Sequence, residues 1–246
     1  MPTISVIIPT LNEEKYVVKL LDNLVAQTAK PDEVVIADCN SEDKTIQFTE
    51  SYKAKLPIKI AHSKHRSPGA ARNAGAKVAK SEYLLFIDAD MHIPKDSLNQ
   101  IQKSLTKKPV DFLTPAYRSD GKSFVDSFNT WLINVWMVGN IKVFHQIFAI
   151  GGVMCVKKEQ HEKVGGFNEN MVVQDDINYA YKLRRVKASY TYLRSLRVII
   201  SSRRWVGYPT VVGLLLLIVQ NSRIGRFFLT PIASKLGLQK KYGQYK

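Results

Sequence analysis

The sequence predicts an α/β fold in which helices pack around an open sheet. Two observations carry this prediction: short, continuous apolar runs recur through the first 117 residues, and segments with helical spacing of apolar residues separate them. The first run is Ile4–Ile8, ISVII, which Pro9 ends. A run of this length, rich in β-branched residues, is typical of a strand buried on both faces of a parallel sheet.

The elements that follow the first strand alternate in the same way. Glu13–Gln27 places apolar residues at helical spacing, and Glu33–Ala37, EVVIA, predicts a second strand. Strand, helix and strand at this interval predict a βαβ unit with a right-handed crossover. The alternation continues with helices at Lys44–Tyr52, Ala70–Ala79 and Lys95–Leu105 and with strands at Ile58–Ala61, Tyr83–Ile87 and Phe112–Thr114.

The regular alternation weakens after Tyr117. Phe124–Ile150 mixes large aromatic residues with polar ones, so we expect an amphipathic segment too interrupted to span a bilayer. Val211–Val219, VVGLLLLIV, is the most apolar stretch, but it falls short of the ~20 residues that a spanning helix needs. It predicts either a buried helix or a helix lying in the membrane interface. We expect one domain over 1–205, with halves 1–117 and 118–205, and a basic, apolar helical extension over 206–246.

The charge of the chain is one-sided. The net charge is +15, and the last 70 residues hold 14 Lys or Arg and no Asp or Glu, which leaves 22 basic and 21 acidic residues in the first 176. A basic tail of this kind favours nucleic acid, anionic lipid or phosphorylated ligands, with a solvated basic face as the alternative. Because the tail is also rich in apolar residues, we favour an anionic partner.

The start of the chain and its cysteines indicate the compartment. The chain begins MPTISVIIPT, without a basic, apolar leader, so we expect an unexported, cytoplasmic protein. Cys39 and Cys155 lie far apart, without Cys or His partners at metal-ligand spacing. We therefore expect buried free thiols rather than a disulfide framework.

Two carboxylates follow the Tyr83–Ile87 strand, as Asp88-Ala89-Asp90. In open α/β sheets, ligands bind beyond the carboxyl ends of the strands. Mg²⁺ and Mn²⁺ prefer oxygen ligands, usually one or two carboxylates together with substrate phosphates. Such a cation stabilises the charge that a diphosphate leaving group develops. Asp88 and Asp90 are therefore candidate metal ligands, although a pair of surface or capping aspartates would look the same.

Other polar residues also lie near the strand ends. Asp38 ends the second strand, where its carboxylate is suited to accept a hydrogen bond from a nucleobase N–H. Arg72 precedes the Tyr83–Ile87 strand, within the small-residue run GAARNAG, and can reach toward phosphate. Each feature also fits a turn, a cap or a packing helix. The other wall of a base and ribose pocket would come from the end of the first strand, at Pro9, Thr10, Asn12 and Glu13.

Taken in order, these runs resemble the family 2 glycosyltransferases, which have the GT-A fold. The matching stretches are VIIPTLNEE, VVIADCNSEDKT, GAARNAG, LLFIDAD and KVGGFNENMVVQDDINYAYKLRR, and they cover about residues 4–185. The resemblance implies a Rossmann-like nucleotide-diphospho-sugar transferase with a mixed sheet flanked by helices. It implies that the nucleotide is held by Pro9, Thr10, Asn12, Glu13 and Asp38, that Arg72 lies near the nucleotide, and that Asp88 and Asp90 serve the metal and the diphosphate.

The last matching stretch carries the acid–base chemistry. The family places an acidic pair, usually Glu-Asp, before a helix, and aligning the Lys-Leu-Arg end puts Asp175 and Asp176 there, with Asp176 as general base. A register shifted by one residue would use Gln174 and Asp175. The chemistry requires a carboxylate within hydrogen-bond reach of the acceptor hydroxyl. A base opposite the departing diphosphate implies direct displacement with inversion. Alternatively, both aspartates only cap a helix that begins at Ile177.

Two further segments resemble the sugar and acceptor side of the family's site. Processive members carry Gln-x-x-Arg-Trp, and Ser201 stands at the Gln position here, so we expect a non-processive enzyme. For the second segment, which contains Arg203, Arg204 and Trp205, the alternative is a surface arginine pair beside a buried tryptophan. The residues implied are Gly151 and Gly152 in a loop, and Arg203, Arg204 and Trp205, which would pair with the diphosphate and stack.

The sequence thus predicts a metal-dependent, inverting transferase of a nucleotide-activated sugar. A UDP-sugar is favoured because Asp38 suits the uracil N3–H, although guanine also offers N–H donors. The acceptor would be a glycan or a lipid-linked molecule, with peripheral contact to the inner face of the cell membrane. A nucleic-acid-binding protein is the main rival, and it leaves the acidic strand ends unexplained. A sugar-nucleotide binder without turnover is the other.

Overall fold

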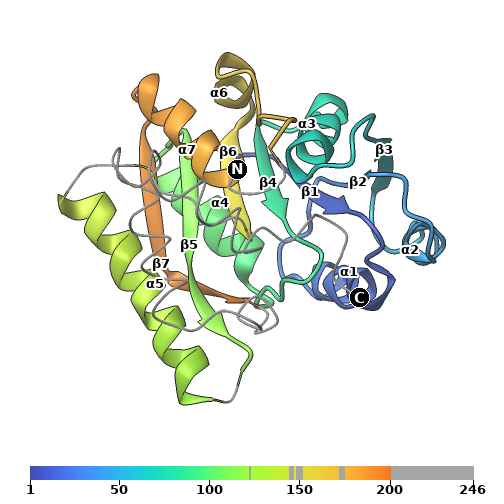
Figure 1. Ribbon diagram of the computed structural model, residues 1–246, viewed down its shortest axis with the longest axis horizontal. Coiled ribbons are helices and arrows are strands. Elements are labelled where there is room, and N and C mark those ends of the chain that lie inside the picture. Colours follow the sequence, from blue (N-terminus) through green and yellow to red (C-terminus); the bar gives the residue numbers. More distant parts are fainter. Residues whose placement is uncertain (122, 144–146, 148–151, 172–174, 201–246) are drawn as a thin grey trace, which may run out of the picture.

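The computed structural model describes residues 1–121, 123–143, 147, 152–171 and 175–200. Within them, seven strands form one sheet in the order β3-β2-β1-β4-β6-β5-β7, with helices on both faces (Figure 1). The predicted α/β sheet flanked by helices is confirmed. The elements are β1 (Ile4–Thr10), α1 (Glu14–Val25), β2 (Glu33–Asp38), α2 (Thr45–Glu50), β3 (Ile58–His62), α3 (Pro68–Val78), β4 (Tyr83–Ile87), α4 (Ser97–Lys107), β5 (Phe112–Ser119), α5 (Phe124–Val143), β6 (Val153–Lys157), α6 (Lys158–Lys163), α7 (Asp175–Arg185) and β7 (Tyr190–Ile200).

The first four strands run parallel. β1 pairs with β2 on one side and with β4 on the other, and β2 pairs with β3. All seven residues of β1 and all five of β4 are buried, as their continuous apolar runs predict. The carboxyl ends of β1, β2 and β4 therefore lie at one edge of the sheet, and the residues just beyond them come together there.

The other three strands make the sheet mixed. β6 runs antiparallel between β4 and β5, and β7 pairs in parallel with β5 across a register shift at Pro115/Ala116. Pairing with β7 extends β5 to Ser119, beyond the predicted end at Thr114. Neither β6 nor β7 was predicted from the alternation of apolar runs, which weakens after Tyr117. The half-exposed edge strand β7 also interleaves charged residues.

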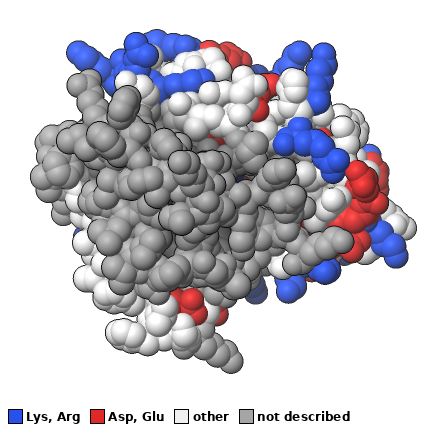
Figure 2. Space-filling model, in the orientation of Figure 1, with Lys and Arg blue, Asp and Glu red and all other residues white. Residues whose placement is uncertain are grey.

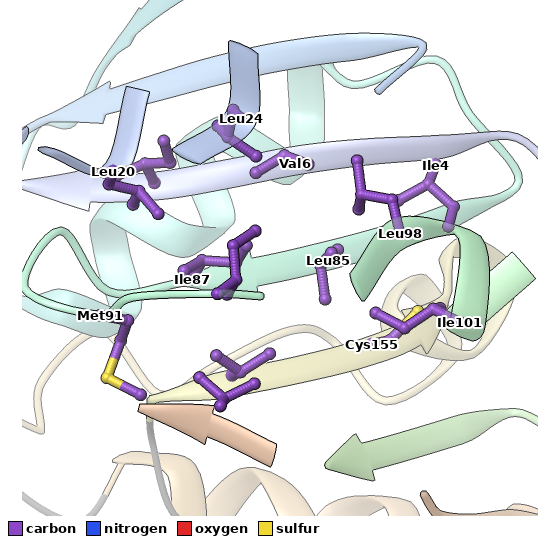
Figure 3. Packing of buried hydrophobic residues seen from close by; sticks show 14 of the residues in the cluster. Ile4, Val6, Leu20, Leu24, Leu85, Ile87, Met91, Leu98, Ile101 and Cys155 are labelled. Atoms are coloured by element: carbon purple, nitrogen blue, oxygen red, sulfur yellow. The ribbon is translucent and has the colours of Figure 1, made fainter. Parts of the chain in front are cut away.

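The alternation of side chains along the strands fills a separate core on each face. Val6 and Ile8 of β1 belong to one cluster, which α1, α4 and α5 cover. Figure 3 shows Leu20 and Leu24 of α1 and Leu98 and Ile101 of α4 against the sheet. Ile7 and Val35 point to the other face, where they meet α3 and α7. Both cysteines are buried free thiols, as predicted.

The helix α5 lies along β5 at one end of the sheet (Figure 1). On this helix, Ile133 and Met137 are buried, whereas Phe124 is 82% and Trp131 56% exposed. The predicted amphipathic character is therefore present in this helix. In the part of the chain described, no helix is long and apolar enough to span a membrane. The Val211–Val219 run and the expected extension over 206–246 lie outside the described residues.

Candidate active site at the carboxyl edge of the sheet

The loops after β1 and β2 are held together by reciprocal hydrogen bonds. Asn12 has a left-handed φ of 56°, a conformation that Asn tolerates better than most residues. Its backbone N–H donates to Ser41 Oγ at 3.0 Å, and its Oδ1 accepts from the Glu42 N–H at 2.9 Å. The Glu13 N–H donates to Thr45 Oγ1 at 2.8 Å. The predicted nucleotide-binding residues of the first loop are thus positioned by the second.

Asp38 lies between these two loops. Pro9 pairs with Ala37 and Thr10 with Asp38 in the strand register. The Asp38 side chain is 1% exposed, and its carboxylate accepts hydrogen bonds from Thr10 Oγ1 at 3.0 Å, from Ser41 Oγ at 2.5 Å and from the Ser41 N–H at 2.9 Å. A carboxylate has about four acceptor positions, so capacity remains for one ligand donor. Ser41, which is not among the predicted site residues, orients this carboxylate.

Arg72 is the central cation of the site. It lies on α3, is 3% exposed, and donates through Nη2 to Asp88 Oδ1 at 2.7 Å and through Nη1 to Asp175 Oδ2. Its guanidinium also lies 5.3 Å from the centroid of the Phe167 ring. The sequence predicts Arg72 beside the nucleotide; its partners in the structure are the end of β4 and the start of α7. Sequence spacing gave no signal for the Asp175 pair, because 103 residues separate the two.

The charges around Arg72 are strongly unbalanced. Burial alone lowers the pKa of the guanidinium, but the Asp175, Asp88 and Asp176 carboxylates outweigh burial and raise that pKa above its ordinary value. Among the residues that the structure describes, three carboxylates thus lie around one permanently charged group. The remaining negative charge favours a further cation or a proton-bearing ligand at this edge.

Asp88 and Asp90 lie in the tight turn that follows β4. The Asp88 N–H donates to the Gly152 carbonyl at 3.0 Å, and its own carbonyl accepts from the Met91 N–H at 3.0 Å. The Asp88 side chain is 20% exposed. Within the described residues, no group of three or more His, Cys, Asp or Glu could hold an ion by itself. Two carboxylates fit Mg²⁺ or Mn²⁺ when substrate phosphates complete the coordination.

The acidic pair lies in the first turn of α7, which begins at Asp175 rather than at Ile177. Both carboxylates there complement the positive end of the helix dipole. Asp175 is 7% exposed and faces Arg72, whereas Asp176 is only partly buried and accepts through Oδ1 from the Ile177 N–H at 2.8 Å. The two aspartates therefore have different surroundings.

A buried aromatic cluster packs α7 against His161 and Phe167. Tyr179 stacks on Phe167 with centroids 4.0 Å apart, and its hydroxyl lies 2.8 Å from His161 Nδ1. Burial, followed by the nearby Lys182 and Lys158, lowers the pKa of His161 to about 4. A neutral imidazole is therefore built into the layer beneath the acidic pair.

Gly152 joins the site because its carbonyl accepts a hydrogen bond from the Asp88 N–H in the turn after β4. A Cβ on Gly152 would lie 2.6 Å from Met91 Cε, the flexible end of a side chain, so a larger residue here would displace that end rather than meet backbone. The predicted residues Gly151, Arg203, Arg204 and Trp205, and Gln174 of the alternative register, lie outside the described residues.

Comparison with known proteins places the chain among sugar transferases. Over 118 residues it is 38% identical to poly(ribitol-phosphate) β-N-acetylglucosaminyltransferase TarS of Staphylococcus aureus, a match that covers 46% of this chain and 20% of TarS. The uncharacterized glycosyltransferase EpsJ of Bacillus subtilis is 23% identical over 73% of this chain and 54% of EpsJ. The chain thus spans well under two thirds of the length of these relatives.

Solved structures show the same fold. TarS residues 1–349 of S. aureus in complex with UDP-GlcNAc match with a TM-score of 0.67 at 23% identity, over 90% of this chain and 67% of that one. The mannosyltransferase PcManGT of Pyrobaculum calidifontis, in complex with GDP-Man and Mn²⁺, matches with a TM-score of 0.70 at 21% identity, over 98% of this chain and 66% of that one. The predicted GT-A fold is therefore confirmed. The model of the glycosyl transferase family 2 matches residues 5–161, and the chain belongs to this family.

Proposed function

We propose that this protein transfers a sugar from a nucleotide-diphosphate sugar to an acceptor by direct displacement with inversion. One observation carries the proposal: at the carboxyl edge of the sheet, where Asp38 ends β2, the buried Arg72 joins Asp88 after β4 to Asp175 at the start of α7. This edge is where open α/β sheets bind their ligands. Membership of a glycosyltransferase family supports the same reaction class.

The nucleotide is proposed to bind between the loops after β1 and β2. The remaining acceptor capacity of Asp38 suits a base N–H, and the rigid bonding of Asn12 and Glu13 to the second loop provides a preformed wall. We favour a UDP-sugar, because TarS, which resembles this chain in sequence and in fold, is solved with UDP-GlcNAc. A GDP-sugar is the second choice, since the mannosyltransferase with the same fold binds GDP-Man.

A divalent cation, Mg²⁺ or Mn²⁺, is proposed to bind Asp88 and Asp90 together with the diphosphate. When bound, it would stabilise the negative charge that the leaving diphosphate develops. Asp88 already shares its carboxylate with Arg72, which holds the turn after β4 in place. Asp90 contributes the second carboxylate from the same turn.

Asp176 is proposed as the general base. The mechanism needs a carboxylate that reaches the acceptor hydroxyl, takes its proton as the C–O bond forms, and lies opposite the departing diphosphate. Asp176 is the less buried member of the acidic pair. If the acceptor were a phosphate, no proton would need to be removed and this carboxylate would be dispensable.

The acceptor is proposed to be a glycan or a lipid-linked molecule of the cell envelope, reached from the cytoplasmic face of the membrane. TarS is named for transfer to poly(ribitol-phosphate), a polyanion. In the view of Figure 2, Lys and Arg side chains gather over α6 and α7, and acidic ones near α2. The exposed aromatic residues of α5 would suit a membrane interface. Liposome flotation tests this part: a chain that stays unbound to anionic vesicles at low salt contradicts it.

Donor binding is the direct test of the proposed function. We expect a thermal shift with one of UDP-, GDP- or dTDP-sugars, larger with Mn²⁺ than with EDTA, and no Mn²⁺-dependent gain in Asp90→Ala. NMR of the product then gives the anomeric configuration. The proposal is wrong if no nucleotide sugar shifts the melting temperature with Mn²⁺ present, or if the product retains the configuration of the donor.

A further inference from the structure

The Arg72 guanidinium joins two segments that are distant in the chain. One end of its planar fork contacts Asp88 after β4, and the other contacts Asp175 at the first residue of α7. The side chains of Arg72 and Asp175 are 4% and 9% exposed. These three residues, which we call the arginine clamp, link the turn proposed to bind the donor to the helix proposed to carry the base.

The geometry of a helix separates the roles of Asp175 and Asp176. Successive residues of an α-helix differ by about 100° in direction around its axis. Because Asp175 points into the protein toward Arg72, its neighbour Asp176 projects in a different direction, to a less buried position.

We propose that Arg72 and Asp175 are positioning residues, which fix the first turn of α7 so that Asp176 alone meets the acceptor. This inference rests on the proposed function and assigns the acidic pair within it. Arg72 is thereby assigned to the support of the base rather than to direct contact with phosphate. The Phe167 ring centroid lies 5.3 Å from the guanidinium carbon, within the range of a cation–π contact that favours this position of the charge.

The fork geometry is specific to arginine. A lysine ammonium is a single point charge, so Arg72→Lys keeps the charge but cannot donate in the same plane to Asp88 and Asp175 together. Asp175→Asn keeps the shape and an acceptor oxygen while it removes the charge. These two variants weaken the clamp with less risk of unfolding than Arg72→Ala, which would remove the whole positive charge from between the two carboxylates.

Glu33→Gln is the matched control. Glu33 is 5% exposed and forms an ion pair with Lys59 at 2.6 Å, but it lies at the amino end of β2, away from the site. Glu33→Gln therefore removes a buried negative charge, as Asp175→Asn does, but at a position away from α7. We expect it to lower the melting temperature and to leave the turnover of the enzyme unchanged.

Hydrogen exchange tests the clamp without any substrate. We expect the amides of Tyr179 and Ala180, in the second turn of α7, to exchange at least ~10-fold faster in Arg72→Lys and Asp175→Asn than in the native chain, because local opening needs less free energy once the clamp is weakened. Glu33→Gln should not change them. Unchanged exchange in both clamp variants would overturn the proposal, whether or not the chain transfers sugar.

Kinetics then separate the two aspartates. Asp176→Asn should lower kcat by about 10³-fold, as for the loss of a general base. Asp175→Asn should lower kcat about 10-fold to 100-fold with the donor KM within about threefold, since misplacement of a catalytic group by ~1 Å costs about that much. If Asp175→Asn is as severe as Asp176→Asn, Asp175 is itself the base and the clamp assignment is wrong. Failure of the proposed function would appear separately, as absence of a donor-induced thermal shift in the native chain.

Discussion

Gly75→Ala tests how closely the helix that carries Arg72 must approach the sheet. Gly75 lies on α3, one turn after Arg72, and faces β1 and β2. A Cβ at this position would lie 2.4 Å from Ile7 Cγ2 and 3.2 Å from Ala37 Cβ. Ile7 is fully buried in a central strand, so it cannot move aside without displacing its own neighbours.

The magnitude follows from two opposing terms. Inserting a methyl group into a packed interior costs about 1–3 kcal/mol, and a contact this short belongs at the upper end of that range. Alanine regains about 1 kcal/mol of helix propensity relative to glycine. We therefore expect a net loss of about 2 kcal/mol in the free energy of unfolding. For a chain of this size, that loss lowers the melting temperature by about 4–8 °C.

The assay compares the same substitution at two helical glycines. Gly139 lies inside α5, and within the described part of the chain a Cβ there would meet no atom of another element within 4 Å. Gly139→Ala should raise the melting temperature by about 2–4 °C, because only the propensity term operates. If Gly75→Ala melts at or above the native temperature, α3 does not need this close approach. A loss in both variants would mean that contacts at Gly75 are not the cause.

Three further perturbations have defined outcomes. Asp38→Asn replaces a charged acceptor of three internal hydrogen bonds, so we expect UDP to bind about 10-fold to 100-fold more weakly in calorimetry. Unchanged affinity would mean that the uracil ring does not bind at Asp38. The folded pKa of His161, about 4, lies below its ordinary value of 6.5, so the unfolded chain takes up the proton first and stability is lost as pH falls from about 6.5 to about 4. Because His161→Gln lacks this titrating group, its melting temperature should fall less than that of the native chain as pH falls from about 6.5 to about 4. A difference in melting temperature that stays constant over this range would contradict a neutral, buried His161. Trp131→Ser, at a position 56% exposed, should change the free energy of unfolding by no more than about 0.5 kcal/mol while it reduces flotation with anionic liposomes; equal flotation would remove α5 from any membrane contact.

Local patterns predicted the parallel half of the sheet well. The runs ISVII, EVVIA and YLLFI are strands β1, β2 and β4, because a strand buried on both faces must be apolar at nearly every position. The helices at α1, α3 and α4 follow equally from their spacing. The antiparallel β6 and the edge strand β7 were missed, since their pairing depends on partners that the local composition does not identify.

The candidate site divides in the same manner. The strand-end positions of Asp38, Asp88 and Asp90 follow from the sequence, because the end of an apolar run also marks the end of the strand. The partners of these residues do not. Thr10 and Ser41 hold the Asp38 carboxylate through the register of β1 on β2, and Arg72 lies between two carboxylates from opposite parts of the chain.

By itself, the sequence determined the α/β architecture and the residues that end the central strands, because burial and local geometry leave a periodic pattern along the chain. The family was indicated by the resemblance of its motifs, taken in order, and not by this pattern. Only the tertiary structure decided that Arg72 pairs with Asp88 and Asp175 and that the two adjacent aspartates of α7 face different surroundings. The physical reason is that a contact across 103 residues depends on the packing of α3 and α7 against the same face of the sheet. That packing is a property of the assembled core, and no short segment specifies it.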